Sequence, residues 1–138
     1  VVVPHKGQPT SIVTNMAARN RIVQSFHFRY VLVKDGSAFD LVGQGYTTPT
    51  GLTGVPSART IIGQKANGQL FVAACTGDTG TAGATIQDVI NFALSEGCIN
   101  AFNLDGGGST TFMSRGVIKN VPSDPGGERA IPAIAYIV

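Results

Sequence analysis

A carboxylate followed by three glycines is the feature of this sequence with the clearest capacity for chemistry. Residues 101–113 read AFNLDGGGSTTFM: Asp105 ends an apolar run, and Gly106, Gly107 and Gly108 lead to Ser109. Glycines adopt positive φ and carry no Cβ, so successive N–H groups can form a cradle for an anion, beside which serine adds a hydroxyl donor. A glycine bulge between paired strands explains the same pattern equally well. On this stretch alone both interpretations stay open.

A second cluster of charge lies about twenty residues later. Asp124, Glu128 and Arg129 fall within six residues of a turn-rich segment. An arginine can clamp a phosphate or a carboxylate through two parallel hydrogen bonds, and a glutamate can transfer a proton. A solvated turn with a local Glu–Arg pair is the alternative interpretation. Arg59, which precedes an apolar run, is a third candidate.

Several familiar sites are excluded by what surrounds these residues. No Gly-Lys-Ser/Thr follows the glycines, so they do not form a Walker loop, and the run after them is strand-like, unlike a dinucleotide fingerprint. No Gly-x-Ser-x-Gly elbow surrounds Ser109. Only two histidines are present, which excludes a histidine-rich metal site. We expect no metal and no cofactor.

The bulk composition describes a globular chain of low charge. Its 138 residues predict a single domain, and 43% of them are hydrophobic. Charged residues make up 13%, about half the usual share. This predicts an extracellular, cell-surface or virion-associated protein. A net charge of +2 argues against nucleic acid as a partner, and no apolar run is long enough for a membrane span.

The ends and the cysteines leave questions open. The chain starts with VVVP rather than methionine, which suggests a piece of a longer product, with the missing part supplied by another polypeptide. Residues 1–34 hold five basic residues and no acid, as a solvated face or an anion-facing edge would. Cys75 and Cys98 fit no metal spacing and form either one disulfide or two buried thiols.

One helix and several strands are predicted around these candidates. Thr85 with Asp88 resembles a capping box, an apolar stripe follows, and Gly97 ends the helix, which spans about 85–96. The Asn67-Gly68 pair predicts a β-hairpin. The strand-like runs are 25–33, 60–63, 70–75, 99–104, 110–114, 117–120 and 131–138. These elements predict an α+β fold in which a mixed, largely antiparallel sheet is packed by one main helix.

The combination of these motifs resembles the phosphodiester glycosidase family. The resemblance rests on Asn103–Thr111, Gly116, Asn120–Asp124 and Gly127–Arg129, with Ala58–Thr60 and the helix start before them, and it covers about 58–138. It implies that the chain is the C-terminal portion of such a domain or a reduced version of it. Two departures stand out: Cys75-Thr76-Gly77-Asp78 replaces an Asp-Gly-Arg-like element, and residues 1–57 lack the family's Asn-Gly-Gly-aromatic start.

The resemblance implies a glycoside hydrolase that cleaves the sugar–phosphate bond of a sugar-1-phosphodiester, with an N-acetylglucosamine-type sugar. Asp105 and Glu128 would be the catalytic pair, and their two roles could be exchanged. The substrate-binding residues would be Arg59, Thr60, Gly106, Gly107, Gly108, Ser109, Ser123, Asp124 and Arg129. A non-catalytic phosphosugar- or glycan-binding domain, or a structural domain of a virion or cell-surface assembly, is the alternative. The expected partner is a phosphate-linked sugar or glycan.

Overall fold

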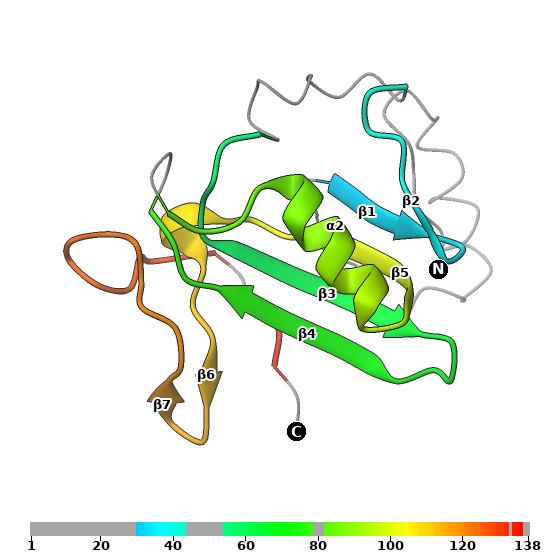
Figure 1. Cartoon of the computed structure of the whole chain (residues 1–138). Helices are drawn as coiled ribbons and strands as arrows, with labels where there is room; N and C mark the ends of the chain where they lie inside the picture. The colour runs from blue at the N-terminus through cyan, green and yellow to red at the C-terminus, as the bar shows by residue number, and fades with distance from the viewer. Residues whose placement is uncertain (1–29, 44–53, 79–81, 133, 137–138) are drawn as a thin grey trace, which may run out of the picture.

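The computed structural model describes residues 30–43, 54–78, 82–132 and 134–136. Within them a five-stranded sheet carries one helix on its face, and a small hairpin extends from one end (Figure 1). The elements are β1 (Tyr30–Lys34), β2 (Ser37–Ala38), β3 (Arg59–Lys65), β4 (Leu70–Cys75), α2 (Ile86–Ser95), β5 (Cys98–Asn103), η1 (Gly107–Ser109), β6 (Met113–Ser114) and β7 (Val117–Ile118). The predicted α+β class is confirmed. No helix in the described ranges is long and apolar enough to cross a bilayer.

The sheet has the strand order β2-β1-β5-β3-β4, and every neighbouring pair is antiparallel. Strand β3 is hydrogen-bonded on both sides, to β4 and to β5. Its first residue, Arg59, therefore lies beside the last residue of β4, Cys75, and close to the end of β5. Three chain segments meet at this end of the sheet, and the glycine loop starts there.

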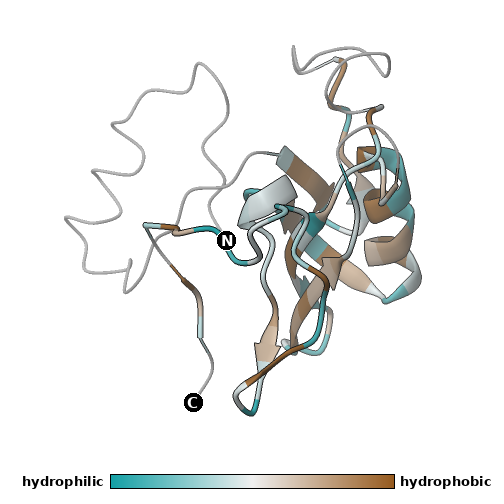
Figure 2. Ribbon diagram, turned by 90° about the vertical axis from the view of Figure 1, so that its left-hand side faces the viewer, coloured by the Kyte–Doolittle hydropathy of each residue, from teal (hydrophilic) through white to brown (hydrophobic). Residues whose placement is uncertain are grey.

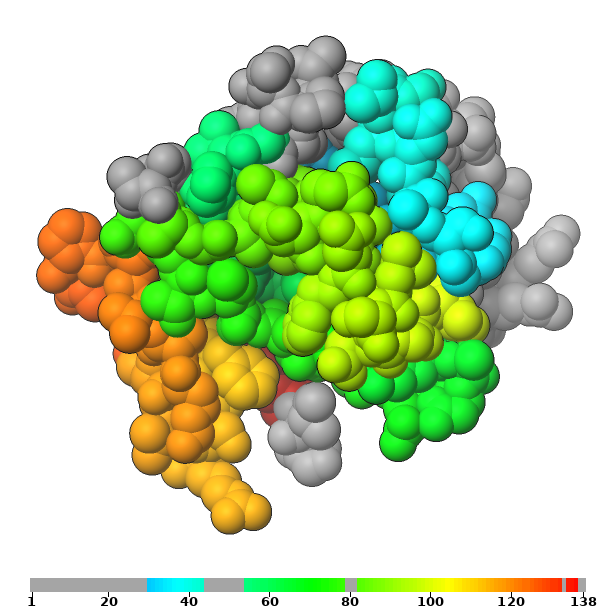
Figure 3. All heavy atoms as spheres, in the orientation of Figure 1, coloured from blue at the N-terminus to red at the C-terminus, as the bar shows by residue number. Residues whose placement is uncertain are grey.

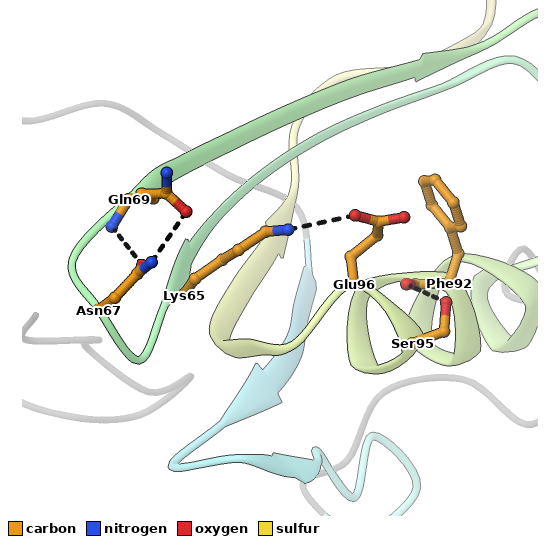
Figure 4. Close-up of polar contacts among 6 residues, drawn as sticks. All are labelled: Lys65, Asn67, Gln69, Phe92, Ser95 and Glu96. Carbon is orange, nitrogen blue, oxygen red and sulfur yellow. Dashed lines mark hydrogen bonds and ion pairs between the residues drawn. The ribbon is translucent and has the colours of Figure 1, made fainter.

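The predicted hairpin at Asn67-Gly68 is confirmed. Lys65 N donates to Gln69 O at 2.9 Å, and Gly68 has the positive φ of +85° that the turn needs. The Asn67 side chain braces the turn by contacting the backbone N–H and the side chain of Gln69 (Figure 4). Local sequence thus sets the register of β3 against β4.

Helix α2 covers one face of the sheet with its apolar stripe. Ile86, Val89, Ile90 and Ala93 are buried, and they pack on strand residues such as Ile61. At the N-terminus both hydrogen bonds of a capping box form, from Asp88 N to Thr85 Oγ1 at 3.1 Å and from Thr85 N to Asp88 Oδ2 at 2.9 Å. The hydrogen bonds from Thr85 hold the pKa of the Asp88 carboxyl below its ordinary value.

The other end of α2 is tied to the hairpin. Gly97 ends the helix at φ +75°, and its N–H donates to Leu94 O. Lys65 reaches from β3 to Glu96 with an Nζ–Oε2 distance of 3.2 Å (Figure 4). The rings of Phe71 and Phe92 meet with centroids 5.8 Å apart. These contacts fix the helix along the sheet.

Both cysteines are free thiols, so the disulfide alternative does not hold. Cys75 pairs with Arg59 at one end of β3 and Cys98 with Lys65 at the other. Six residues of strand separate the two sites by about 20 Å, too far for a disulfide. Burial raises the pKa of the Cys98 thiol.

The C-terminal strand prediction is wrong for the described residues of 131–138. Residues 131, 132 and 134–136 are not in a strand, and Ile134 and Tyr136 are 74% and 78% exposed. An apolar run forms a strand only where another strand takes its backbone hydrogen bonds, and no described strand pairs with it. The hairpin predicted at 110–120 forms, but with two residues in each strand. Of the predicted strand 25–33, residues 25–29 lie outside the described ranges.

Replacing Thr85 with alanine should lower the free energy of unfolding by about 1 kcal/mol, because the N-cap hydrogen bond is lost. Urea denaturation of the variant and of Gln87→Ala, an exposed substitution on the same helix, measures the difference. Because the folded-state pKa of Asp88 is lowered, the capping box stabilises the fold above the ordinary carboxyl pKa. That stabilisation is lost as the pH falls through the lowered pKa. Equal stability of Thr85→Ala and wild type would contradict the capping role.

Candidate functional site

The glycine loop is held against the start of β3 by the backbone. Leu104 N donates to Thr60 O and Gly107 N donates to Ala58 O, both at 2.9 Å. A Cβ on Gly106 would lie 2.7 Å from Ala58 O, so no other residue fits there without moving the backbone. Gly107 has φ +58°, which also favours glycine. Figure 2 shows η1 and helix α2 on opposite sides of the strands.

Most amides of the glycine loop are already hydrogen-bonded within the protein. Gly106 N donates to Asp105 Oδ1, Gly107 N to Ala58 O, Ser109 N to Gly106 O, and Thr110 N to Gly107 O. Among the described residues, the N–H of Gly108 is the one in this stretch that has no such partner. The loop is therefore a tight turn rather than a cradle of several amides, and the one amide without such a partner belongs to the buried residue Gly108.

An ion pair lies directly on Gly108. Asp124 Oδ2 accepts from Arg129 Nε at 2.8 Å and Asp124 Oδ1 from Arg129 Nη2 at 2.9 Å. A Cβ on Gly108 would lie 2.1 Å from Asp124 Oδ1 and 2.5 Å from Arg129 Nη2. The hydrogen bonds and charge of Asp124, with a smaller contribution from the charge of Asp105, raise the pKa of the Arg129 guanidinium. The sequence predicted a local Glu–Arg pair as an alternative, but the partner of Arg129 is Asp124.

One side chain anchors the segment that carries this ion pair. Asn120 accepts from Phe112 N at 2.6 Å and donates to Thr110 O at 2.8 Å. The next residue, Val121, donates its N–H to Thr76 Oγ1 at 3.2 Å. The exit of the glycine turn, the end of β4 and the 121–129 segment are thereby joined, while the hairpin β6–β7 between them projects from the body (Figure 3).

The remaining acids and hydroxyls have different environments. Asp105 and Glu128 are exposed, whereas Ser109 and Ser123 are half-buried. Glu128 makes no hydrogen bond or ion pair with the described residues. Asp105 begins the turn, where its Oδ1 accepts from Gly106 N, and the Arg129–Asp124 pair lies on Gly108 of the same turn. The structure thus brings Gly108, Asp124 and Arg129 into contact and places Asp105 at the start of their turn.

Two buried polar residues behind the loop were not among the predicted site residues. Thr110 is fully buried and accepts from Thr60 Oγ1 at 3.2 Å, which places the predicted residue Thr60 beneath the loop. Asn103 is 1% exposed and donates to Leu104 O at 2.6 Å, while its Oδ1 has no partner in the described part of the chain. Both residues lie in the Asn103–Thr111 motif. Their burial could not be predicted from it, because it depends on the strands that pack around them.

The family follows from comparison of the sequence. The profile described as phosphodiester glycosidase matches residues 1–138, a wider range than the 58–138 of the resemblance. The chain belongs to the phosphodiester glycosidase family. Its residues 1–57, which lack the family's usual opening motif, are included in the match.

Two relatives show which proteins this phosphodiester glycosidase chain is similar to. Human N-acetylglucosamine-1-phosphodiester alpha-N-acetylglucosaminidase is 43% identical over 70 residues, which are 51% of this chain and 14% of the human protein. The SPbeta prophage-derived uncharacterized protein YomE of Bacillus subtilis is 38% identical over 121 residues, 87% of this chain and 17% of that protein. The chain therefore spans a small part of the length of each relative.

A solved structure supports the same relationship. The zebrafish N-acetylglucosamine-1-phosphodiester alpha-N-acetylglucosaminidase catalytic domain, described as auto-inhibited by its pro-peptide, superposes with a TM-score of 0.62 at 29% identity. The match covers 72% of this chain and 35% of the zebrafish chain. The sheet and helix described above are thus part of a larger domain in that relative.

Arg59 has a different environment from Arg129 in this phosphodiester glycosidase chain. It is 7% exposed, and its Nε and Nη2 donate to Ala84 O at 2.9 Å and Val55 O at 2.7 Å. It thereby holds the segment before β3 against the segment before α2. There Ser57 and Ala84 exchange backbone hydrogen bonds, and a Cβ on Gly83 would lie 2.4 Å from Ser57 O. Its burial favours a supporting role over direct contact with a ligand.

The departure from the family pattern at Cys75–Asp78 also has a structural context. Thr76 accepts from the 121–129 segment, and Asp78 is exposed with its carbonyl accepting from Ala82 N. In the described residues, no group of three or more histidine, cysteine, aspartate or glutamate side chains could hold a metal ion.

Replacing Arg59 with lysine should lower the free energy of unfolding by about 2 kcal/mol or more, because a lysine cannot reproduce two fixed donors to buried carbonyls. Urea denaturation measures this, with Arg129→Lys as the matched control. The Arg129 side chain is 50% exposed, and loss of a solvent-exposed ion pair costs about 0–1 kcal/mol. Equal stability of the two variants would contradict the supporting role of Arg59.

Proposed function

We propose that this chain carries part of the active site of a hydrolase that cleaves the sugar–phosphate bond of a sugar-1-phosphodiester. The observation that carries the proposal is an arginine that Asp124 holds on Gly108, three residues along the glycine turn from Asp105. A fixed cation and a carboxylate on the same turn suit a reaction in which opposite charges develop on neighbouring groups of the substrate.

Hydrolysis of such a substrate breaks the bond between the anomeric carbon and the phosphate oxygen. Positive charge then develops on the sugar ring and negative charge on the departing phosphate. Asp105 stabilises the sugar cation or attacks it, and Arg129 stabilises the phosphate. Water supplies the hydroxyl group of the released sugar, and a phosphate monoester leaves.

The other predicted residues have supporting roles in this proposal. Glu128, exposed and without a protein partner in the described residues, orders the sugar hydroxyls or the attacking water. In this proposal the amide of Gly108 and the hydroxyls of Ser109 and Ser123 donate hydrogen bonds to the substrate; both serines are half-buried. Glu128 and Asp105 could exchange roles.

The comparisons support the class of substrate. The human and zebrafish relatives are named for N-acetylglucosamine-1-phosphodiester, so an N-acetylglucosamine-type sugar is the first substrate to test. The chain covers 35% of the zebrafish chain, and we propose that further residues, from the same or another polypeptide, complete the site. The low charge fits action outside the cell or on a virion.

Asp105→Asn should lower the rate of hydrolysis of an N-acetylglucosamine-1-phosphodiester by on the order of 10²-fold or more, because the amide cannot stabilise the sugar cation. Release of the phosphate monoester measures the rate. Asp35→Asn, an exposed aspartate in the β1–β2 turn, is the matched control and should retain wild-type activity. Equal rates for Asp105→Asn and wild type would remove Asp105 from the mechanism. Binding of the diester without turnover by wild type would favour the non-catalytic alternative.

Arg129→Ala should lower kcat/KM for the same diester by on the order of 10²-fold, the scale for losing one transition-state donor. Arg115→Ala, in the exposed β6–β7 turn, removes the same side chain elsewhere and should change kcat/KM little. Steady-state kinetics of both variants provide the comparison. A wild-type kcat/KM for Arg129→Ala would rule out the phosphate contact.

A further inference from the structure

We propose that Asp124 is a positioning residue that aims Arg129, and not a substrate contact as the family resemblance implies. The inference rests on the proposed function only in assigning phosphate to Arg129. The geometry of the pair itself is independent of that assignment.

Both oxygens of the carboxylate are occupied by one edge of the guanidinium. Oδ2 binds Nε at 2.8 Å and Oδ1 binds Nη2 at 2.9 Å, a two-pronged pair. Such a pair fixes the plane of the guanidinium and the direction of its remaining donors. Nη1 makes no hydrogen bond with the described residues, so its two N–H groups and the second N–H of Nη2 are the donors left for a ligand.

The plane of the pair is also fixed by the turn beneath it. Gly108 leaves no room for a Cβ, which would lie 2.1 Å from Asp124 Oδ1 and 2.5 Å from Arg129 Nη2. The backbone that carries the carboxylate forms a turn, because Gly127 N donates to the backbone carbonyl of Asp124 at 2.9 Å. Arg129 is therefore restrained from two directions, by the carboxylate along its edge and by the glycine below.

Stability does not account for this arrangement. The side chains of Arg129 and Asp124 are 50% and 33% exposed, and exposed ion pairs contribute about 0–1 kcal/mol. The carboxylate also reduces the net attraction of Arg129 for an anion, since it places a negative charge beside the positive one. The Asp124 carboxylate therefore weakens the attraction of Arg129 for a bound anion but fixes the direction of its N–H donors. Orientation of this kind acts mainly on kcat.

The first test measures kcat and KM separately for hydrolysis of the N-acetylglucosamine-1-phosphodiester by Asp124→Asn. We expect kcat to fall by on the order of 10–10²-fold, because the guanidinium loses its orientation. We expect KM to stay the same or fall, because the competing charge is gone. In an Arg129→Ala background Asp124→Asn should cause no further loss. A rise in KM at unchanged kcat, or a full additional loss in the double variant, would overturn the proposal and make Asp124 a substrate contact.

The second test does not need turnover. The ¹⁵N NMR signal of Arg129 Nε–H should show a restricted side chain in wild type and a mobile one in Asp124→Asn. Gly108→Ala should mobilise it too, whereas Gly126→Ala, where a Cβ meets no atom within 4 Å, should not. Unchanged Nε mobility in both Asp124→Asn and Gly108→Ala overturns the positioning role. A wild-type protein that shows the restricted signal but no diester hydrolysis contradicts the proposed function and leaves the positioning role supported.

Discussion

The close approach of the glycine loop to the start of β3 is the constraint on which the candidate site depends. One hydrogen bond from Gly107 N to Ala58 O joins them, and the carbonyl of Ala58 lies where a side chain at residue 106 would begin. Because β3 is bonded to a strand on each side, this carbonyl belongs to a rigid framework. The turn that follows β5 is thereby fixed before any side chain contributes.

The three consecutive glycines are required for three different reasons. Gly106 avoids the carbonyl of Ala58, Gly107 adopts a positive φ, and Gly108 lies under an ion pair. The sequence suggested a single reason, either an anion cradle or a bulge. Neither describes the loop, since its amides are hydrogen-bonded within the described part of the protein except that of the buried residue Gly108. Under the proposed function, the chemistry at this loop therefore comes from the side chains around it more than from its amides.

The parts of the fold that short-range sequence determines were predictable. The capping box at Thr85, the Gly97 stop and the Asn67-Gly68 turn each rest on residues within a few positions of one another, and all three were found. The C-terminal run at 131–136 failed because an apolar pattern does not show whether a strand partner exists. Local sequence patterns therefore predicted caps, turns and apolar runs. Whether an apolar run becomes a strand depends on pairing with another strand.

The site was harder to predict because residue type does not report burial or partner. Arg59 and Arg129 have the same side chain, but one donates to buried backbone carbonyls and the other pairs with a carboxylate at the surface. The pairing of Arg129 with Asp124 rather than the adjacent Glu128 depends on how the 121–129 segment is anchored. That anchor is Asn120, which follows β7 and binds the segment before β6, together with Thr76 after β4, which accepts from Val121 N. Polar side chains that join separate segments in this way leave no periodic trace in a sequence, although they determine where the arginine is held. The orientation of the charged groups is therefore a property of the whole end of the sheet, and a loop motif read by itself could identify Asp105 and Arg129 but not their geometry.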